Sequence, residues 1–454
     1  MFRANFNTSI LSSRYPLFLF TSLLICIPFS LDITSGNNAI NIPAELLIFC
    51  LTLLMAWSIL KIKLIPFLKH PISLVFISFH IWSLISTFFS QWPGVSIKYN
   101  LVSYSHFICF YLGYYYFEIK LKRNLSEWLY FYCIGLIPVI VYTWLHHAKY
   151  LFRLDAIPIT PRPFYNDHTL YSACLAMILP FSFLQKTNIF KHYKVGYWFG
   201  LILIFAITFS FSRATWLSTI AAAFCTCLIS YTKILKTLFI PFMMMALIAG
   251  IVFIPGKIIH HRIRPNPDST QGIINDPSAR LAINDSKGVS NMERLNRYSC
   301  AIRMAKDHPW LGIGPGCFQF AFVPYQLPDQ MTRISIRPEV EYDRANKSRG
   351  HGGGAHSEVF QSLSELGLPG MVLWLSVFVI SFYSLIKMIR RKTVHSYALT
   401  LAIFFALMTY FIHGFFNNFL HNEELSVLFY AVLSKVVILD QSKDKIEDLS
   451  ICNE

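Results

Sequence analysis

The sequence has few charged residues for its length. Of its 454 residues, 14% are charged and 54% are hydrophobic, and the mean hydropathy is +0.47. A soluble globular protein carries roughly 25% charged residues. This deficit, together with 41 Phe and 23 Tyr, argues against an ordinary soluble domain and indicates that lipid is the main solvent.

Several chemical signatures are also missing. Ten cysteines are present, but no CxxC or Cys/His spacing predicts a metal site, and most of them fall in apolar runs as small hydrophobic residues. Only Cys300 and Cys317 share a long loop, where a disulfide could form in an oxidising compartment. The glycines of 312–316 lack the Lys-Ser/Thr of a phosphate loop, so a tight turn is expected there.

The positive charge does not indicate a nucleic-acid-binding protein. The formal net charge is +15, yet the cations lie mainly between apolar runs. The Phe and Tyr residues are spread through those runs and form no basic-aromatic module. The membrane therefore accounts for many of the cations.

The sequence predicts an all-α, polytopic membrane protein of about twelve transmembrane helices. Its apolar runs approach the roughly 20 residues that cross a bilayer. They are continuously apolar, without the alternation of a lipid-facing strand, which favours helices over a barrel. The first run resembles a signal peptide but has no convincing cleavage site, so it is expected to be retained. The predicted spans are 16–32, 43–60, 72–90, 101–117, 127–146, 169–185, 195–211, 214–231, 235–254, 369–386, 397–414 and 422–438.

The distribution of Lys and Arg predicts the orientation of these spans. With the N-terminus inside, the short inside segments contain 17 Lys and Arg residues and the short outside segments contain 5. Both termini are then expected in the cytoplasm. Residues 1–254 would form helices one to nine, residues 369–438 helices ten to twelve, and residues 439–454 a cytoplasmic tail.

One loop, residues 255–368, is far longer than the others and is expected outside the membrane. A structureless loop of this length is uncommon unless it is functional. Two helical patterns interrupt it, at 291–307 and 355–366. His308 and Pro309 end the first of them. The loop is therefore predicted to be partly helical and to carry the active site.

Two arginines on the predicted outer face are candidate functional residues. Arg213 lies at the outer end of the seventh span, where it must reach lipid headgroups or meet an anion. Arg294 opens the first loop helix. In that charge-rich turn, the alternative is a solvated surface on which Glu293 pairs with Arg297 four residues later.

A histidine follows the glycine-rich stretch 350–354. His356 is expected to open the second loop helix, and a histidine at a helix N-terminus protonates less readily. Such a neutral imidazole suits a general base. The alternatives are a polar surface residue, or His351 as the base in its place.

Five motifs occur in a fixed order along the chain: Phe211–Trp216, Glu293–Arg294 with Tyr298, Asp307–Gly316, Ala355–Ser357 and Glu365–Gly370. Taken together, these segments resemble the bacterial O-antigen ligase and polymerase superfamily of lipid-linked glycan transferases. The order also matches, with an arginine at the outer end of a span and one large periplasmic loop late in the chain. The resemblance covers about 160 residues at motif level and does not separate the members of the superfamily.

The resemblance implies roles for individual residues. Arg213 and Arg294 match arginines that bind the pyrophosphate of an undecaprenyl-linked glycan. His356 matches the histidine that activates the acceptor hydroxyl. Arg297 and Tyr298 are candidate neighbours in substrate binding.

His351 is also a candidate substrate-binding residue, and two positions depart from the family pattern. The family often has Trp where this chain has Tyr298, and Asn where it has Ser357. These departures leave the three basic positions in place.

The implied enzyme is a glycosyltransferase of the bacterial inner membrane that acts at the periplasmic face without a metal or other cofactor. Guanidinium groups suit the charge that develops on a departing phosphate. An O-antigen ligase with lipid A-core as acceptor is the first hypothesis. The others are a repeat-unit polymerase, a protein O-oligosaccharyltransferase, and a transporter of lipid-linked sugars. Few charges inside the spans favour an enzyme over a transporter, and the glycan, acceptor and oligomeric state stay open.

Overall fold

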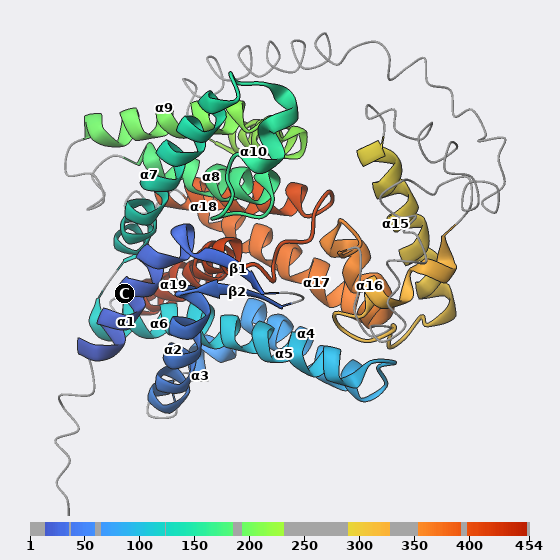
Figure 1. Ribbon diagram of the computed structural model, residues 1–454. Helices are drawn as coiled ribbons and strands as arrows, with labels where there is room; N and C mark the ends of the chain where they lie inside the picture. Colours follow the sequence, from blue (N-terminus) through green and yellow to red (C-terminus); the bar gives the residue numbers. More distant parts are fainter. Residues whose placement is uncertain are drawn as a thin grey trace, which may run out of the picture.

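The computed structural model describes residues 14–35, 38–59, 65–122, 124–184, 193–230, 289–326, 353–391 and 397–451. Within these ranges the protein is helical apart from one short hairpin (Figure 1). The predicted ninth span, 235–254, lies outside the described residues. So do His351 and large parts of the predicted loop.

The first part of the chain forms a series of apolar helices. A proline or an asparagine marks several of their starts. Pro71 and Pro93 occupy first helical turns, and the Asn124 side chain accepts a hydrogen bond from the amide of Glu127 at 3.1 Å. The elements are α1 (Arg14–Cys26), η1 (Ile27–Phe29), α2 (Ala44–Ile59), α3 (Ile65–Leu68), α4 (Pro71–Phe88), α5 (Pro93–His106), the π-helix η2 (Phe107–Leu112), α6 (Gly113–Leu121) and α7 (Leu125–Lys149).

The second part contains the helices that build the candidate site. One of them, α17, is broken internally at Gly367, whose φ of 72° and ψ of −172° are not helical. The elements are η3 (Leu154–Ile159), α8 (His168–Ser182), α9 (Tyr193–Phe209), α10 (Arg213–Ile229), α15 (Val289–Asp307), α16 (Phe318–Ala321), η4 (Val323–Tyr325), α17 (Glu358–Arg390), α18 (Tyr397–His413) and α19 (Glu423–Ile451).

The helices agree in position with the predicted spans. Every predicted span inside the described ranges overlaps a helix. Of the described helices, 4 are long and apolar enough to cross a membrane, and they belong to α4, α7, α17 and α19. Six shorter apolar helices accompany them, including α8, α10 and α18. The total of twelve spans stays a prediction.

A hairpin between α1 and α2 departs from the all-α expectation. Strands β1 (Leu31–Ser35) and β2 (Asn38–Ile42) pair antiparallel, with Ile33 opposite Ile40. Two short runs with alternating isoleucines flank Gly36 and Asn37, which is a hairpin signal. The apolar spans on either side obscured this signal.

The bundle is organised around α18 and α19. The stretch of α19 from Leu425 to Val437 is buried on all sides, as expected for a helix that is largely apolar around its circumference, and its buried polar residues are Ser426, Ser434 and Lys435. Helix α18 packs against α8 and α10, and α17 packs against α4. Helix α15 stands to one side and packs against α17 (Figure 1).

Two glycine-rich segments interlock where α15 meets α17. A Cβ on Gly312 would lie 2.2 Å from the carbonyl carbon of Glu365, and a Cβ on Gly367 would lie 2.2 Å from the carbonyl oxygen of Trp310. Both glycines have positive φ, at 64° and 72°. Only glycine allows this backbone-to-backbone contact. The predicted tight turn after α15 is therefore present, and its partner is the break in α17.

Hydrogen bonds hold the same junction. The amide of Leu368 donates to Pro309 O at 2.8 Å. The carboxylate of Glu365 accepts the amides of Gly316 and Phe318, each at 2.9 Å. Glu365 thus supplies acceptors for a loop whose amides would otherwise be buried without partners.

Cys300 and Cys317 do not form the disulfide considered above. Both thiols are free, and both side chains are fully buried in a small apolar cluster beneath α15. Burial raises the pKa of Cys300 to about 11, so the thiol stays protonated at neutral pH.

We predict that Gly312→Ala and Gly367→Ala each destabilise the protein by about 2 kcal/mol or more, because each adds a clash to an unfavourable φ. Gly94→Ala is the matched control, since a Cβ there meets nothing within 4 Å. Thermal unfolding of the purified protein in detergent would measure all three. Equal melting temperatures for the three variants would contradict the interlocked junction.

Candidate active site

The start of α17 is fixed by the turn that follows α18. The carbonyl of Gly414 accepts the amide of Glu358 at 2.7 Å and the hydroxyl of Ser357 at 3.1 Å. A glycine at the end of α18 is a common helix terminator, and it leaves this carbonyl accessible to a second helix. The turn therefore sets the position of His356, which directly precedes Ser357.

The next two carbonyls of the turn hold α15. The hydroxyl of Tyr298 donates to Phe415 O at 2.6 Å, and Nε of Arg294 donates to Phe416 O at 3.3 Å. The Tyr298 ring also stacks on Phe360, with centroids 4.6 Å apart. Arg294 and Tyr298, one turn apart on α15, are thus both bonded to the end of α18.

Arg213 approaches from α10. It is the first residue of that helix and is exposed, after Ser212, whose hydroxyl accepts the amide of Thr215 at 3.4 Å. The hydroxyls of Thr215 and Ser172 lie 2.6 Å apart. Because Ser172 belongs to the start of α8, this contact places the N-termini of α8 and α10 side by side.

The two arginines predicted from the sequence share one electrostatic environment. Arg294 is half-buried. Burial lowers its pKa, Tyr298 acts in the opposite direction, Arg213 lowers it further, and Asp167 raises it. An arginine remains charged despite such a shift. Two positive charges therefore face a common region, with Asp167 nearby.

His356 lies just before α17, which corrects the sequence expectation that it opens the helix. The helix begins at Glu358 with Ser357 as N-cap, and His356 has a left-handed φ of 53°. The glycine-rich stretch predicted a helix start three residues too early, at Ala355. The imidazole is held by a turn rather than by a regular helix.

The imidazole of His356 is neutral at pH 7. Burial, followed by the positive charges of Arg297 and Arg294, lowers the pKa of His356 to about 4, against the opposite effect of Asp167. The sequence also predicted a neutral histidine, but from the dipole at a helix N-terminus. In the structure the causes are burial and two guanidinium groups.

Arg297 is placed differently from the other predicted residues. It is fully buried, and its Nε lies 2.7 Å from Oε1 of Glu293, which is the i,i+4 pair considered from the sequence. Its Nη1 donates to Gly353 O at 3.0 Å and to Gly354 O at 2.7 Å. Its Nε and Nη1 are thus bonded to the protein itself, whereas its buried Nη2 has no hydrogen-bond partner among the described residues.

Three polar residues near the arginines were not identified from the sequence. Asp167 caps α8 by accepting the amide of Thr169 at 2.8 Å, and His168 follows it. His413 ends α18 and interacts electrostatically with Asp167 and Arg294. A signal was present, because Asp167 and His168 directly precede a predicted span on the same predicted side as Arg213.

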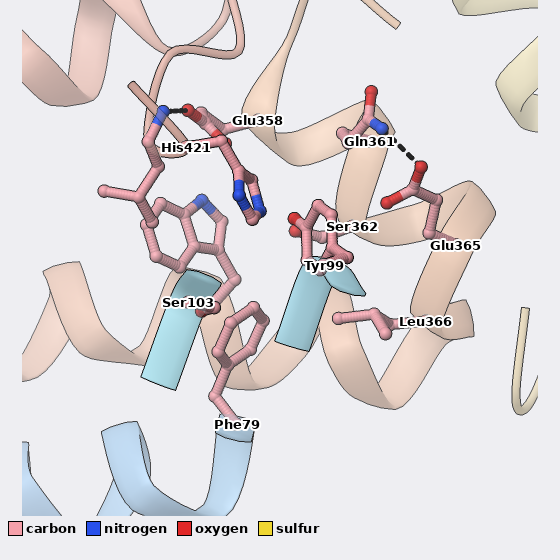
Figure 2. A pocket seen from close by; sticks show the side chains of 11 residues that line it. Phe79, Tyr99, Ser103, Glu358, Gln361, Ser362, Glu365, Leu366 and His421 are labelled. Carbon is pink, nitrogen blue, oxygen red and sulfur yellow. Dashed lines mark hydrogen bonds between the residues drawn. The ribbon is translucent and has the colours of Figure 1, made fainter. Parts of the chain in front are cut away.

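A separate small cavity lies beneath the first turns of α17 (Figure 2). It has room for about one water molecule and contains none of the basic residues discussed above. Oε1 of Glu358 accepts the amide of Leu420 at 2.8 Å and the hydroxyl of Tyr410 at 3.0 Å. The amide group of Gln361 donates to Glu365. These hydrogen bonds hold the first turns of α17. The cavity is lined by Phe79, Tyr99, Ser103, Glu358, Gln361, Ser362, Glu365, Leu366, Trp374, Leu420 and His421.

The described residues offer no cluster of three His, Cys, Asp or Glu side chains arranged to hold a metal ion. The site is instead a group of cations around a neutral imidazole. Such a group can bind a phosphate-containing anion through charge-assisted hydrogen bonds.

Residues 198–375, which include much of this site, match the family model described as O-antigen ligase. This segment belongs to the O-antigen ligase superfamily. The matched segment contains Arg213, Arg294 and His356, whereas Asp167 and His413 lie outside it. No curated protein matches the chain.

The O-antigen ligase match supports a glycosyltransferase-type enzyme. Together with the apolar helices it indicates a membrane protein whose partners are, in general terms, a lipid-linked glycan and an acceptor.

We predict that the His356 imidazole titrates near pH 4 in the free protein. Arg294→Gln should raise this pKa because it removes one of the nearby positive charges, whereas Arg294→Lys should leave it nearly unchanged. Nuclear magnetic resonance of ¹⁵N-histidine-labelled protein in detergent would measure the titration, with assignment by comparison with His356→Asn. A pKa near 6.5 in the unmodified protein would contradict the buried, cation-flanked environment.

The same shift has a consequence for stability. An unfolded histidine has a pKa of about 6.5. The unfolded chain therefore binds the proton first, and the contribution of His356 makes the fold less stable as the pH falls from about 6.5 towards 4.

Proposed function

We propose that this protein is an O-antigen ligase that transfers a glycan from undecaprenyl pyrophosphate to a hydroxyl of lipid A-core at the periplasmic face of the inner membrane. The observation that carries the proposal is the convergence of Arg213, Arg294 and a neutral His356. These residues come from three separate segments, and each interacts electrostatically with another of the group.

The donor side of the site is supported by charge and by backbone geometry. Arg213 and Arg294 would bind the pyrophosphate, since guanidinium groups stay charged and form paired hydrogen bonds to phosphate. The adjacent N-termini of α8 and α10 add backbone amides and helix dipoles of the same sign. As the bond from the sugar C1 to the phosphate oxygen breaks, negative charge grows on the phosphate between these groups.

The acceptor side is assigned to His356. The acceptor oxygen would bond to C1 while its proton passes to the free nitrogen of the imidazole, and from there to water. A pKa near 4 makes the free enzyme a weak base. A bound pyrophosphate next to Arg294 would offset the positive charges and raise the pKa of His356 towards the working pH. The base would thus gain strength once the donor is present.

Attack from the side opposite the pyrophosphate inverts the anomeric configuration. This geometry needs no covalent enzyme intermediate, because the leaving group is already good. Product isolated with retained configuration would contradict this mechanism.

We predict that Arg213→Gln and Arg294→Gln each lower kcat for transfer by about 10²-fold, the loss typical for removing one donor to a developing anion. His356→Asn should cause a similar loss, because asparagine tolerates the left-handed backbone but cannot accept the proton. The assay uses purified protein, an undecaprenyl pyrophosphate-linked glycan and lipid A-core.

A matched control lies on the same helix. Arg303 donates to Tyr325 O at 2.7 Å and does not belong to the group around His356. Arg303→Lys should leave the transfer rate within about twofold, whereas Arg294→Lys should lower it clearly because the fork geometry is lost. Equal rates for the two lysine variants would contradict a donor-binding role for Arg294.

The acceptor can be tested in cells. A strain lacking this gene should make bare lipid A-core and accumulate long lipid-linked glycan. Complementation with the unmodified gene should restore full-length lipopolysaccharide, and the Arg294→Gln gene at matched expression should not. The lipopolysaccharide profile on a gel is the measurement.

Other profiles would identify the alternatives. Core that carries a single repeat unit would indicate a polymerase. A normal lipopolysaccharide profile would contradict both the ligase and the polymerase hypotheses and indicate another glycan, a protein acceptor or a transporter.

A further inference from the structure

Arg297 has a different environment from the arginines assigned to the donor. Its side chain is fully buried, whereas Arg213 is exposed and Arg294 is half-buried. Oε1 of Glu293 lies 2.7 Å from its Nε, and its guanidinium carbon lies 5.0 Å from the centre of the Phe322 ring. The guanidinium is therefore enclosed by the protein, and two of its three nitrogens are bonded to protein groups, while Nη2 is buried without a hydrogen-bond partner among the described residues.

Arg297 instead binds the backbone segment that leads to His356. Its Nη1 reaches the carbonyls of both Gly353 and Gly354. Gly353 has a φ of 69°, and a Cβ on Gly354 would lie 2.1 Å from Nδ2 of Asn418. The segment therefore lies close against its surroundings in a conformation that glycine permits.

His356 itself needs such support. A non-glycine residue with a left-handed backbone costs about 1 kcal/mol or more, and it persists only where its surroundings fix it. The amide of Ala355 donates to Oε1 of Gln361 at 2.6 Å. The hydroxyl of Tyr298, which donates to Phe415 O, also lies 3.3 Å from His356 O. Arg297 adds two hydrogen bonds on the side before the histidine, to Gly353 O and Gly354 O.

We propose that Arg297, neutralised by Glu293, is a positioning residue that holds the imidazole of His356 in its working orientation. The fork of the guanidinium is essential, since it binds a carboxylate through one nitrogen and two carbonyls through another. Lysine retains the charge but not this geometry. The proposal rests on the proposed function for its kinetic test, and on the structure alone for its second test.

The kinetic test compares Arg297→Lys with the unmodified enzyme in the transfer assay. We expect kcat to fall about 10- to 100-fold, because a small displacement of a catalytic group has effects of this size. The KM for the lipid-linked donor should stay within about twofold. In a His356→Asn background, Arg297→Lys should lower the residual rate by less than about twofold, since both changes then act on one step.

A second variant distinguishes a loss of positioning from a loss of folding. The double substitution Glu293→Gln with Arg297→Met removes the buried pair without leaving an unpaired charge. It should keep the melting temperature closer to that of the unmodified protein than Arg297→Met alone, and show the same loss of kcat as Arg297→Lys.

The structural test does not depend on activity. Hydrogen–deuterium exchange of the full-length protein should show faster exchange at the amide of Ala355 in Arg297→Lys. The amides of Gly316 and Phe318, which Glu365 holds, are the internal reference and should be unchanged.

The outcomes separate the two proposals. A raised donor KM with unchanged kcat, or an additive effect in the His356→Asn background, would overturn positioning and make Arg297 a donor contact. Unchanged exchange at Ala355 would overturn it as well. If the unmodified protein transfers no glycan while Arg297→Lys still accelerates exchange at Ala355, the proposed function fails and the backbone support by Arg297 stands.

Discussion

The candidate site depends on three successive carbonyl groups in the turn that ends α18. Gly414 O accepts donors from the start of α17, Phe415 O accepts the Tyr298 hydroxyl, and Phe416 O accepts Nε of Arg294. The last carbonyls of a helix have no partner within the helix, so they are available for such bonds. The turn after α18 therefore holds both α15 and the start of α17. It thereby sets the position of Arg294 relative to His356.

The same arrangement sets the electrostatics. Bringing Arg294 and buried Arg297 towards one histidine, and Arg213 towards Arg294, costs free energy through repulsion and desolvation, and Glu293 and Asp167 offset part of this cost. The imidazole responds by staying neutral. An anion bound between the exposed and the half-buried arginine would remove much of the repulsion. If the proposed pyrophosphate binds there, it therefore lowers the electrostatic free energy of the site.

The sequence predicted the helical class and the positions of the apolar helices, because long apolar runs are local signals, whereas the roles of Arg213, Arg294 and His356 stay predictions. It failed where distant segments decide the outcome. The start of α17 at Glu358 depends on Gly414, which is more than fifty residues away. Arg297 and Arg294 are three residues apart on α15 and similar in type, yet Arg297 is fully buried and bonds to Gly353 and Gly354, which no local pattern predicts. Asp167 precedes a span, and nothing local connects it to α15.

The glycine motifs lie at the junction of α15 and α17, which fits motifs that indicate a superfamily without indicating an acceptor. Gly312 and Gly367 contact backbone, and the Glu365 carboxylate binds the amides of Gly316 and Phe318. These residues hold α15 against α17 and so set the position of Arg294, the proposed donor-binding arginine, relative to His356, the proposed base. Enzymes that share a pyrophosphate donor share this requirement, whatever hydroxyl they glycosylate. Acceptor selectivity must therefore depend on side chains that these motifs leave free.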